Sequence, residues 1–262
     1  MTSEKIFKDK WALVTGASAG IGVALAKELA CAGAKLILTA RRVDRLEALA
    51  AELRAKGSEV RVVAADLNDP AAPAAIFKAV ADLKVEILIN NAGLGQFGRA
   101  YEAEIEQELS QVRVNCEAMV HLTRLFVPAM VERRCGWVLI VSSLASYLPM
   151  PYLATYAATK VFDRNYALAL AEEVGRFGVH VTALCPGSTE SEFFEVSRAG
   201  RISGGKRQSA EDVARRGVLA LARGKRIEIP SLAGKAIALL SWVLPTRVMT
   251  LLVALMASRG SF

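Results

Sequence analysis

Histidine is scarce in this chain, whose 262 residues contain only His121 and His180. One lies in a helical pattern and the other begins a strand pattern, which argues against a histidine-ligated zinc site and a Ser-His-acid hydrolase. Four cysteines stand at positions 31, 116, 135 and 185, without the C-x-x-C spacing of metal sites. They fit buried thiols better than a set of disulfides. We therefore predict no metal site and a cytoplasmic location.

The sequence also lacks an internal repeat, a low-complexity tract, a linker and a cleavable signal at its charged N-terminus. Strand and helix patterns instead alternate from Trp11 to Ile229, which predicts one α/β domain with a Rossmann-type, doubly wound parallel sheet. Seven strands should begin near residues 11, 35, 59, 85, 136, 180 and 226, and Gly33 and Gly57 should end helices. Residues 1–230 should form the main body, and 231–262 an apolar helical segment of the same domain.

A glycine-rich turn follows the first predicted strand. Residues 11–15 lead into Gly16, Gly20 and Gly22, and a helical pattern continues from there to Gly33. The G-x-x-x-G-x-G spacing differs from the commoner G-x-G-x-x-G. The physics is the same, because glycines let the backbone approach a pyrophosphate at a helix N-terminus. The strand-turn-helix context therefore predicts a dinucleotide site, with Ser18 and Ile21 in the turn.

The end of the second predicted strand indicates which dinucleotide to expect. An NAD-binding protein would place an acid here to hold the ribose 2′-hydroxyl, but Ala40 is followed by Arg41 and Arg42. A guanidinium matches a 2′-phosphate, and no carboxylate repels it. We predict NADP(H), with Arg41 as the main contact and Ser18 as a second. The alternative is that both arginines are ordinary surface charges at the start of a helix, where acids are normally favoured.

Tyr156 and Lys160 are four residues apart, which places a phenol and an ammonium on one helix face. A neighbouring cation stabilises a phenolate, so the pair is suited to proton transfer near neutral pH. On its own, such a pair is more often a solvated helix face. Ser143 ends an apolar strand pattern thirteen residues upstream, where its hydroxyl could bond a substrate oxygen. The alternative is a serine that caps the next segment, a role that Ser142 could take.

These motifs, with Asn90-Asn91-Ala92-Gly93, Asn115 and Pro186-Gly187, resemble the short-chain dehydrogenase/reductase family over roughly residues 8–230. The resemblance implies that residues 1–230 form a Rossmann-fold dinucleotide-binding and catalytic domain of a nicotinamide-dependent oxidoreductase. Tyr156 would transfer the proton and Ser143 would orient the substrate oxygen. Lys160 would stabilise the phenolate and hold the nicotinamide ribose, and Asn115 would anchor a water relay toward Lys160.

The resemblance implies further cofactor contacts, and one of these segments departs from the family pattern. The contacts are Asp66, Leu67, Asn91, Ala92, Gly93, Pro186, Gly187, Thr189 and Ser191. Relatives usually carry an aliphatic residue at the position of Thr189 and a threonine at that of Ser191. Ser191 keeps a hydroxyl for the nicotinamide carboxamide, and Thr189 can serve through its backbone. The nicotinamide contacts should therefore survive, with less certain side-chain roles.

Residues expected around the reacting carbonyl are mostly apolar or aromatic. They are Leu94, Phe97, Ser143, Leu144, Ala145, Tyr147, Met150, Tyr152, Phe193 and Phe194. This set lacks a partner for a substrate carboxylate, so we predict a lipophilic ketone or secondary alcohol. Segment 189–209, which contains three glycines, would be a substrate lid.

The leading hypothesis is an NADP(H)-dependent carbonyl reductase or alcohol dehydrogenase. An alternative within the same enzyme class is a 3-ketoacyl-thioester reductase that acts on acyl carrier protein or CoA substrates. An alternative from another class is a catalytically idle, NADP-binding scaffold at a membrane. The presence of Ser143, Tyr156 and Lys160 argues against the scaffold, which would need none of the three.

Basic residues concentrate between Arg198 and Arg226, where nine of them accompany only Glu211 and Asp212. This excess equals the +7 net charge of the whole chain. The simplest interpretation is a solvated surface. Anionic lipid headgroups and an acidic carrier or substrate are alternatives. Nucleic acid ranks last, since neither aromatic interleaving nor a known binding module accompanies the charge.

Residues 236–256 form an apolar run that Pro245 and Arg247 interrupt. Each half is too short to span a bilayer, so we predict two short helices. These helices would cover the substrate pocket or pack against the partner in a homodimer or homotetramer. Docking on a membrane surface is a second hypothesis, with peripheral contact through residues 198–257.

Overall fold

The computed structural model describes residues 6–190, 192, 197 and 207–258. Ser191, Phe193 and Phe194, which the sequence assigned to the cofactor and substrate sites, lie outside the described residues. So do most of the predicted lid and three of the nine basic residues, Arg198, Arg201 and Lys206.

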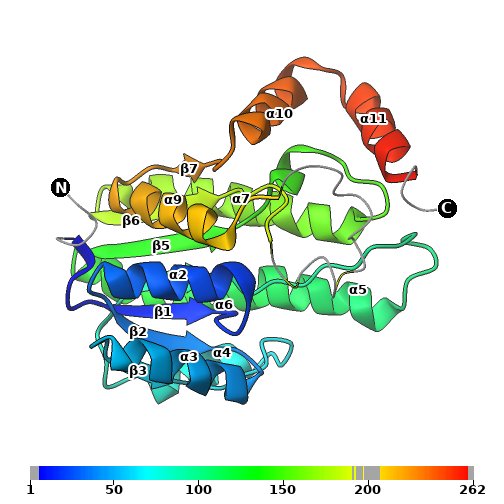
Figure 1. Cartoon of the computed structure of the whole chain (residues 1–262). Helices are drawn as coiled ribbons and strands as arrows, with labels where there is room; N and C mark the ends of the chain where they lie inside the picture. The colour runs from blue at the N-terminus through cyan, green and yellow to red at the C-terminus, as the bar shows by residue number, and fades with distance from the viewer. Residues whose placement is uncertain (1–5, 191, 193–196, 198–206, 259–262) are drawn as a thin grey trace.

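Seven parallel strands form one sheet in the order β3-β2-β1-β4-β5-β6-β7, which confirms the predicted doubly wound Rossmann-type architecture (Figure 1). The strands are β1 (Trp11–Thr15), β2 (Lys35–Thr39), β3 (Val60–Val62), β4 (Val85–Asn90), β5 (Gly136–Val141), β6 (Val179–Leu184) and β7 (Ile227–Glu228). Each begins at or within one residue of its predicted start. The chain order reverses between β1 and β4, where an open α/β sheet leaves a crevice for a ligand.

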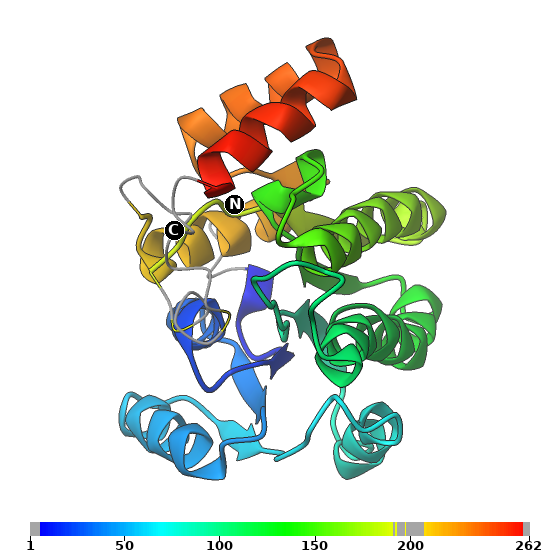
Figure 2. The same cartoon turned by 90° about the vertical axis from the view of Figure 1, so that its right-hand side faces the viewer.

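Helices cover both faces of the sheet (Figures 1 and 2). One face carries α2 (Gly20–Cys31), α3 (Val43–Ala55) and α9 (Ala210–Ala222). The other carries α4 (Ala72–Ala79), α6 (Ala118–Glu132) and α7 (Ala154–Gly175), with α5 (Ile105–Val112) packed against α7. Two short helical segments join these elements, a π-helix η1 (Arg113–Glu117) and a 3₁₀-helix η2 (Leu144–Tyr147).

The strands are apolar on both sides because both faces of the sheet are covered. In β1, Ala12 and Val14 pack toward α2 and α9, while Leu13 between them packs toward α4 and α6. All three side chains are fully buried. The predicted helix stops are confirmed: Gly33 and Gly57 follow α2 and α3 with φ of 80° and 88°, values that glycine adopts without strain.

The C-terminal region forms two helices, α10 (Leu232–Val243) and α11 (Thr246–Ser258), which meet at Pro245 as predicted. They form a hairpin outside the sheet and its helical layers (Figures 1 and 2). The start of α10 packs against η2, where a Cβ on Gly234 would lie 3.7 Å from Leu144 Cδ1. Among the residues that the structure describes, no helix has the length and apolarity to span a bilayer.

Candidate active site

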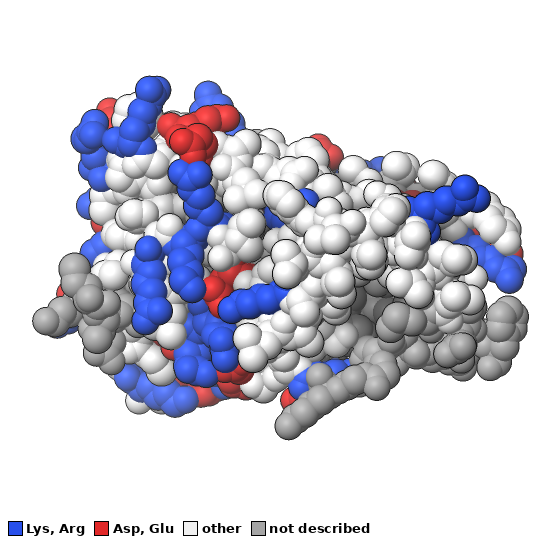
Figure 3. Space-filling model, turned by 90° about the horizontal axis from the view of Figure 1, so that it is seen from above, with Lys and Arg blue, Asp and Glu red and all other residues white. Residues whose placement is uncertain are grey.

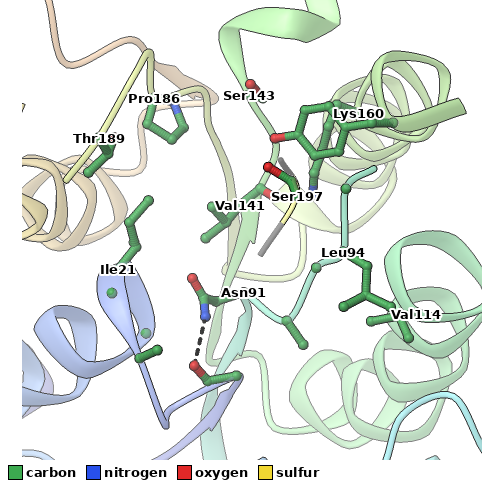
Figure 4. A pocket seen from close by; sticks show the side chains of 18 of the residues that line it. Ile21, Asn91, Leu94, Val114, Val141, Ser143, Lys160, Pro186, Thr189 and Ser197 are labelled. Atoms are coloured by element: carbon green, nitrogen blue, oxygen red, sulfur yellow. Dashed lines mark hydrogen bonds between the residues drawn. The ribbon is translucent and has the colours of Figure 1, made fainter. Parts of the chain in front are cut away.

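A cleft of about 480 Å³ opens at the carboxyl ends of the strands. This volume falls within the range of small-molecule and cofactor sites. Figure 4 shows side chains from the glycine turn, β4, β5, α7 and the segment after β6 converging on the cleft. The predicted residues that line it are Gly16, Ser18, Gly20, Ile21, Gly22, Arg41, Arg42, Asp66, Leu67, Asn91, Ala92, Gly93, Leu94, Ser143, Ala145, Met150, Tyr156, Lys160, Pro186, Gly187 and Thr189.

The glycine turn is shaped to receive an anion. Gly16 has a φ of 66°, and a Cβ on Gly22 would lie 2.2 Å from the Gly16 carbonyl oxygen, so neither position accepts a side chain. Helix α2 begins after Ala19, without a side-chain cap and without an acid in its first turn. Its first N–H groups and the positive end of its dipole therefore face the cleft, as a pyrophosphate requires.

A hydrogen-bonded bracket holds the turn against β4. Thr15 Oγ1 accepts bonds from the N–H groups of Asn91 and Ala92 at 2.9 and 3.0 Å. In return, Asn91 Nδ2 donates to the Thr15 carbonyl oxygen at 2.8 Å. Thr15 belongs to the glycine motif, but its role as an acceptor that ties the turn to β4 was not predicted from the sequence, although a polar residue at the end of an apolar strand was an available signal.

Both arginines after β2 line the cleft, and their contacts within the protein differ. Arg42, and not Arg41, contacts Ser18, with 3.3 and 3.2 Å from Nε and Nη2 to Ser18 Oγ. Arg41 is exposed to solvent at the cleft edge. Arg42 is half-buried against Ser18 and Arg41 is exposed, so this edge of the cleft carries two guanidinium groups.

An acid that was not predicted from the sequence, Glu192, lines the cleft beside the two arginines. Glu192 accepts a 2.8 Å hydrogen bond from Arg42 Nη1 and another from Arg45. These hydrogen bonds lower the pKa of Glu192 below its ordinary range, so it is ionised at neutral pH. The pairing joins residues 150 positions apart, and the sequence carried no signal for it.

Tyr156 and Lys160 lie one turn apart on α7, and Lys160 Nζ is 5.9 Å from the centre of the Tyr156 ring. Lys160 is only 4% exposed. Its ammonium donates to the Val141 carbonyl oxygen at 2.9 Å and to Asp163 Oδ2 at 2.8 Å. Burial is the largest single effect and lowers the pKa of Lys160, but the charge and hydrogen bond of Asp163, together with Tyr156 and Cys116, raise the pKa on balance. The lysine therefore stays cationic beside the tyrosine.

Of the two serines after β5, Ser143 and not Ser142 caps the segment that follows. Ser143 is the N-cap of η2 and accepts a 3.1 Å bond from the Ala145 N–H, whereas Ser142 donates to the Lys160 carbonyl oxygen at 2.7 Å. Ser143 nonetheless lines the cleft (Figure 4), and its hydroxyl hydrogen remains available for a ligand. Ser142 instead fixes α7 to the end of β5.

Asn115 lies in the π-helix η1 and does not line the cleft. Its Oδ1 accepts a 2.7 Å bond from the Leu94 N–H, and its Nδ2 donates to the Leu94 carbonyl oxygen and to Thr159 Oγ1, both at 2.9 Å. These bonds join the segment after β4 to α7. Such π-turns within helices are common at functional sites. Here the turn places the Asn115 amide within a buried helical stretch.

Asn115 and Lys160 flank the same glycine. A Cβ on Gly93 would lie 3.4 Å from Lys160 Nζ and 3.5 Å from Asn115 Oδ1. Both polar atoms therefore lie on the side of Gly93 where any other residue would carry its side chain. This arrangement is compatible with the predicted relay toward Lys160, which stays a prediction.

The substrate end of the cleft is apolar, with corrections to its membership. Leu148 and Leu153 join the predicted Leu94, Leu144, Ala145 and Met150 in the lining, whereas the predicted Tyr147 does not line the cleft. Phe97 and Tyr152 do not line it, because their rings pack against each other with centroids 5.8 Å apart. The Tyr152 carbonyl oxygen also accepts a 2.9 Å bond from the Gly98 N–H, which ties the two loops together.

Within the described residues, no three His, Cys, Asp or Glu side chains form a group that could hold a metal ion. The two largest pKa shifts among the cysteines follow from burial, which raises the pKa of the Cys116 thiol to about 12 and that of Cys185 to about 11. Both thiols therefore stay protonated at neutral pH and do not act as nucleophiles.

Comparisons with known proteins agree with this geometry. The chain is 38% identical over 178 residues to a very-long-chain 3-oxoacyl-CoA reductase of Pyrenophora tritici-repentis, a match that covers 65% of this chain and 52% of that protein. The chain thus spans about half the length of such curated relatives.

Two solved structures share the fold over most of their length. A short-chain dehydrogenase of Sphingobium yanoikuyae in complex with NADPH has a TM-score of 0.82 and 30% identity, covering 89% of this chain and 93% of that one. A short-chain dehydrogenase/reductase of Burkholderia phymatum in complex with NAD has a TM-score of 0.83 and 27% identity, covering 90% and 93%.

The profile of the short chain dehydrogenase family matches residues 10–201, which include the glycine turn, the Asn91 bracket and the Ser143, Tyr156 and Lys160 site. This match covers well over half of the chain. The protein belongs to the short-chain dehydrogenase family.

Proposed function

We propose that this protein is an NADP(H)-dependent carbonyl reductase or alcohol dehydrogenase that acts on a lipophilic ketone or secondary alcohol. The observation that carries the proposal is that Ser143, Tyr156 and Lys160 line one cleft with the anion-binding glycine turn. When bound in this cleft, a nicotinamide cofactor supplies or accepts the hydride.

The chain's own residues handle the proton and the developing charge. In the direction of reduction, the Tyr156 hydroxyl donates a proton to the carbonyl oxygen of the substrate. The Ser143 hydroxyl donates a hydrogen bond to the same oxygen and stabilises its negative charge. The buried ammonium of Lys160 stabilises the phenolate that Tyr156 leaves behind, and its contacts with Val141 and Asp163 hold it in place.

The preference for NADP(H) rests on Arg41 and Arg42, both of which line the cleft where NAD-binding proteins carry an acid. The NADPH complex of the Sphingobium relative supports this preference. Replacing Arg41 or Arg42 with alanine should weaken NADPH binding by about tenfold or more, because each change removes a charged donor to the 2′-phosphate. Titration with NADPH and NADH would measure both affinities.

NADH binding should change little in either variant, since it has no 2′-phosphate. Arg45→Ala is a matched control, because Arg45 also pairs with Glu192 but does not line the cleft. Equal losses for NADH and NADPH would contradict the assignment of these arginines.

The apolar lining supports a lipophilic substrate. Leu94, Leu144, Leu148, Met150 and Leu153 surround the region next to Ser143 and Tyr156. We expect NADPH oxidation to be fastest with bulky apolar ketones in a panel of aliphatic, steroid, sugar and acyl-thioester carbonyl compounds. A preference for the sugar or another strongly polar carbonyl compound would contradict the proposed substrate class.

A 3-oxoacyl-thioester reductase is the second candidate function. It is favoured by the similarity to very-long-chain 3-oxoacyl-CoA reductases, and an acyl chain suits the same apolar lining. Within the ketone panel, faster turnover of a long-chain 3-oxoacyl-CoA than of steroid or aliphatic ketones would favour this candidate.

We also propose that the protein is a homo-oligomer. Ile105, Leu109 and Val112 on α5 and Phe162 on the neighbouring α7 are exposed apolar side chains. Apolar side chains gathered on neighbouring helices suit contact with a second copy.

A further inference from the structure

We propose that the α10–α11 hairpin docks this protein on an anionic membrane surface. Large apolar side chains are concentrated on the exposed side of the hairpin, and we call this set the apolar face. Its members are Leu232, Leu239, Leu240, Trp242, Val243, Val248, Leu251, Leu252 and Leu255. Trp242 and Leu232 are the most exposed, at 86% and 83%.

The hairpin leaves this face open because only a few small or flexible residues pack inward. Gly234 and Ala238 of α10 and Met249 of α11 are buried, while every member of the apolar face is at least 44% exposed. The hairpin that carries this face lies outside the sheet and its helical layers (Figures 1 and 2). Isolated exposed apolar residues are common on soluble proteins, but a contiguous set of this size marks an interaction surface.

The charges of the hairpin favour a lipid surface as the occupant. The sequence contains no Asp or Glu after Glu228, whereas Lys235 and Arg247 lie on the hairpin itself. Stable attachment to a membrane takes two signals, an apolar insertion and a cationic contact with anionic headgroups. Trp242 adds a side chain that prefers the boundary between headgroups and acyl chains.

The same charges disfavour a second copy of this chain as the occupant. A two-fold interface built from the hairpin would bring the Lys235 and Arg247 side chains of both copies to one surface. The hairpin carries no carboxylate to pair with them. Burying unpaired cations between two proteins is costly, whereas at a lipid surface both side chains can reach the anionic headgroups.

The basic segment before the hairpin offers less unpaired positive charge to a membrane than its composition suggested. Arg215 and Arg216 pair with Asp212, and Lys225 pairs with Glu228. Figure 3 shows Lys and Arg gathered with acidic partners at one end of the upper surface, beside a mostly uncharged area. The docking surface is therefore narrower than the 198–257 segment expected from the sequence, and consists of the apolar face with Lys235 and Arg247.

Flotation with vesicles tests the proposal on the full chain, without substrate or cofactor. The intact protein should float with vesicles of equal parts phosphatidylcholine and phosphatidylglycerol, and less with phosphatidylcholine alone. The double variant Leu239→Glu/Trp242→Glu should remain in the soluble fraction, because a carboxylate on the apolar face opposes both insertion and anionic headgroups. Tyr101→Glu is a matched control, since Tyr101 is an exposed aromatic residue of the segment between β4 and α5 and not part of the hairpin, and should float like the intact chain.

Charge variants measure the electrostatic contribution to vesicle binding. Lys235→Gln and Arg247→Gln should each reduce the vesicle partition coefficient by about fivefold, the effect of one cation near an anionic surface. NADPH affinity should be unchanged in all of these variants, which confirms that they fold, and this readout separates the docking proposal from the proposed enzymatic function.

Three outcomes would overturn the proposal. The intact chain could fail to float, or the double variant could float as well as the intact chain. The third outcome is a dimer in sedimentation velocity that the double variant dissociates, without flotation of the intact chain. That result would assign the apolar face to a second copy instead.

Discussion

Replacing Tyr156 with phenylalanine should reduce ketone turnover by about 10²- to 10⁴-fold, the usual contribution of a positioned general acid. The change removes one hydroxyl and keeps the ring that packs one turn before Lys160. NADPH affinity should therefore stay close to that of the unchanged protein. Single-turnover oxidation of NADPH with a saturating ketone would measure the loss in the chemical step.

Tyr152→Phe is the matched control for this experiment. Tyr152 is the other tyrosine near the cleft, but no lysine follows it at four residues and its ring packs against Phe97 outside the lining. Its variant should retain most of the turnover. If Tyr156→Phe kept full activity, the proton would have another donor and the proposed mechanism would be wrong.

Most of the fold could be predicted from local patterns. The strands begin where expected because each buried parallel strand is a short apolar run with clear limits, such as Lys35 at the start of β2. Gly33 and Gly57 end helices for a local reason as well, since their φ values favour glycine. The interruption between α10 and α11 at Pro245 also has a local cause, because proline cannot continue a helix. Whether another surface covers the resulting hairpin depends on contacts beyond the local sequence.

The candidate site was predictable where a motif carries the geometry, and less so where long-range contacts decide it. The glycine turn and the Tyr156–Lys160 pair have spacings that determine their shape. The contact of Arg42 with Glu192 and the packing of Phe97 on Tyr152 join distant segments, so no spacing indicated them. The choice between Ser142 and Ser143 as the cap depended on the turn that follows β5.

Asp163 shows a different limit of prediction from the sequence. Its spacing from Lys160 can be read from the sequence, but its burial cannot. A lysine and an acid three residues apart on a helix usually form a weak surface pair. Here Asp163 is only 2% exposed, and its Oδ2 lies 2.8 Å from Lys160 Nζ. Its charge also raises the pKa of Lys160 against the lowering effect of burial. Asp163 therefore acts through Lys160, as a residue that keeps the catalytic cation charged and in position.

Asp163→Asn should destabilise the protein by about 3–5 kcal/mol, since breaking a buried ion pair leaves the other charge uncompensated. For a chain of this size, the melting temperature should fall by about 6–20 °C. Asp212→Asn is the surface control, because Asp212 pairs with Arg215 and Arg216 in partly exposed positions. Its effect should be about 1 kcal/mol or less. Urea unfolding of both variants would measure the difference.

The effect of Asp163→Asn should depend on pH in a defined direction. In the unchanged protein, the raised pKa of Lys160 contributes stability below its ordinary value of 10.5, and this contribution is lost as pH rises through the higher folded value. In the variant the Asp163 charge and hydrogen bond are gone, so burial, the largest single effect on Lys160, lowers its pKa against the smaller effects of Tyr156 and Cys116. The ammonium then costs stability at neutral pH. The gap in unfolding free energy should be widest near pH 7 and narrow above about pH 10. Cys116, the neighbouring thiol, stays neutral over most of this range because burial raises its pKa to about 12.

The pH dependence of turnover distinguishes this positioning role of Asp163 from a merely structural role. If Asp163 keeps Lys160 charged, the alkaline decline of turnover should begin at lower pH in Asp163→Asn than in the unchanged protein. The double variant Lys160→Met/Asp163→Leu should recover stability, because an apolar pair can replace a buried ion pair at little cost, but it should remain inactive. An alkaline limb that does not move, with stability lost equally at pH 7 and above pH 10, would show that Asp163 fills space without sustaining the charge of Lys160.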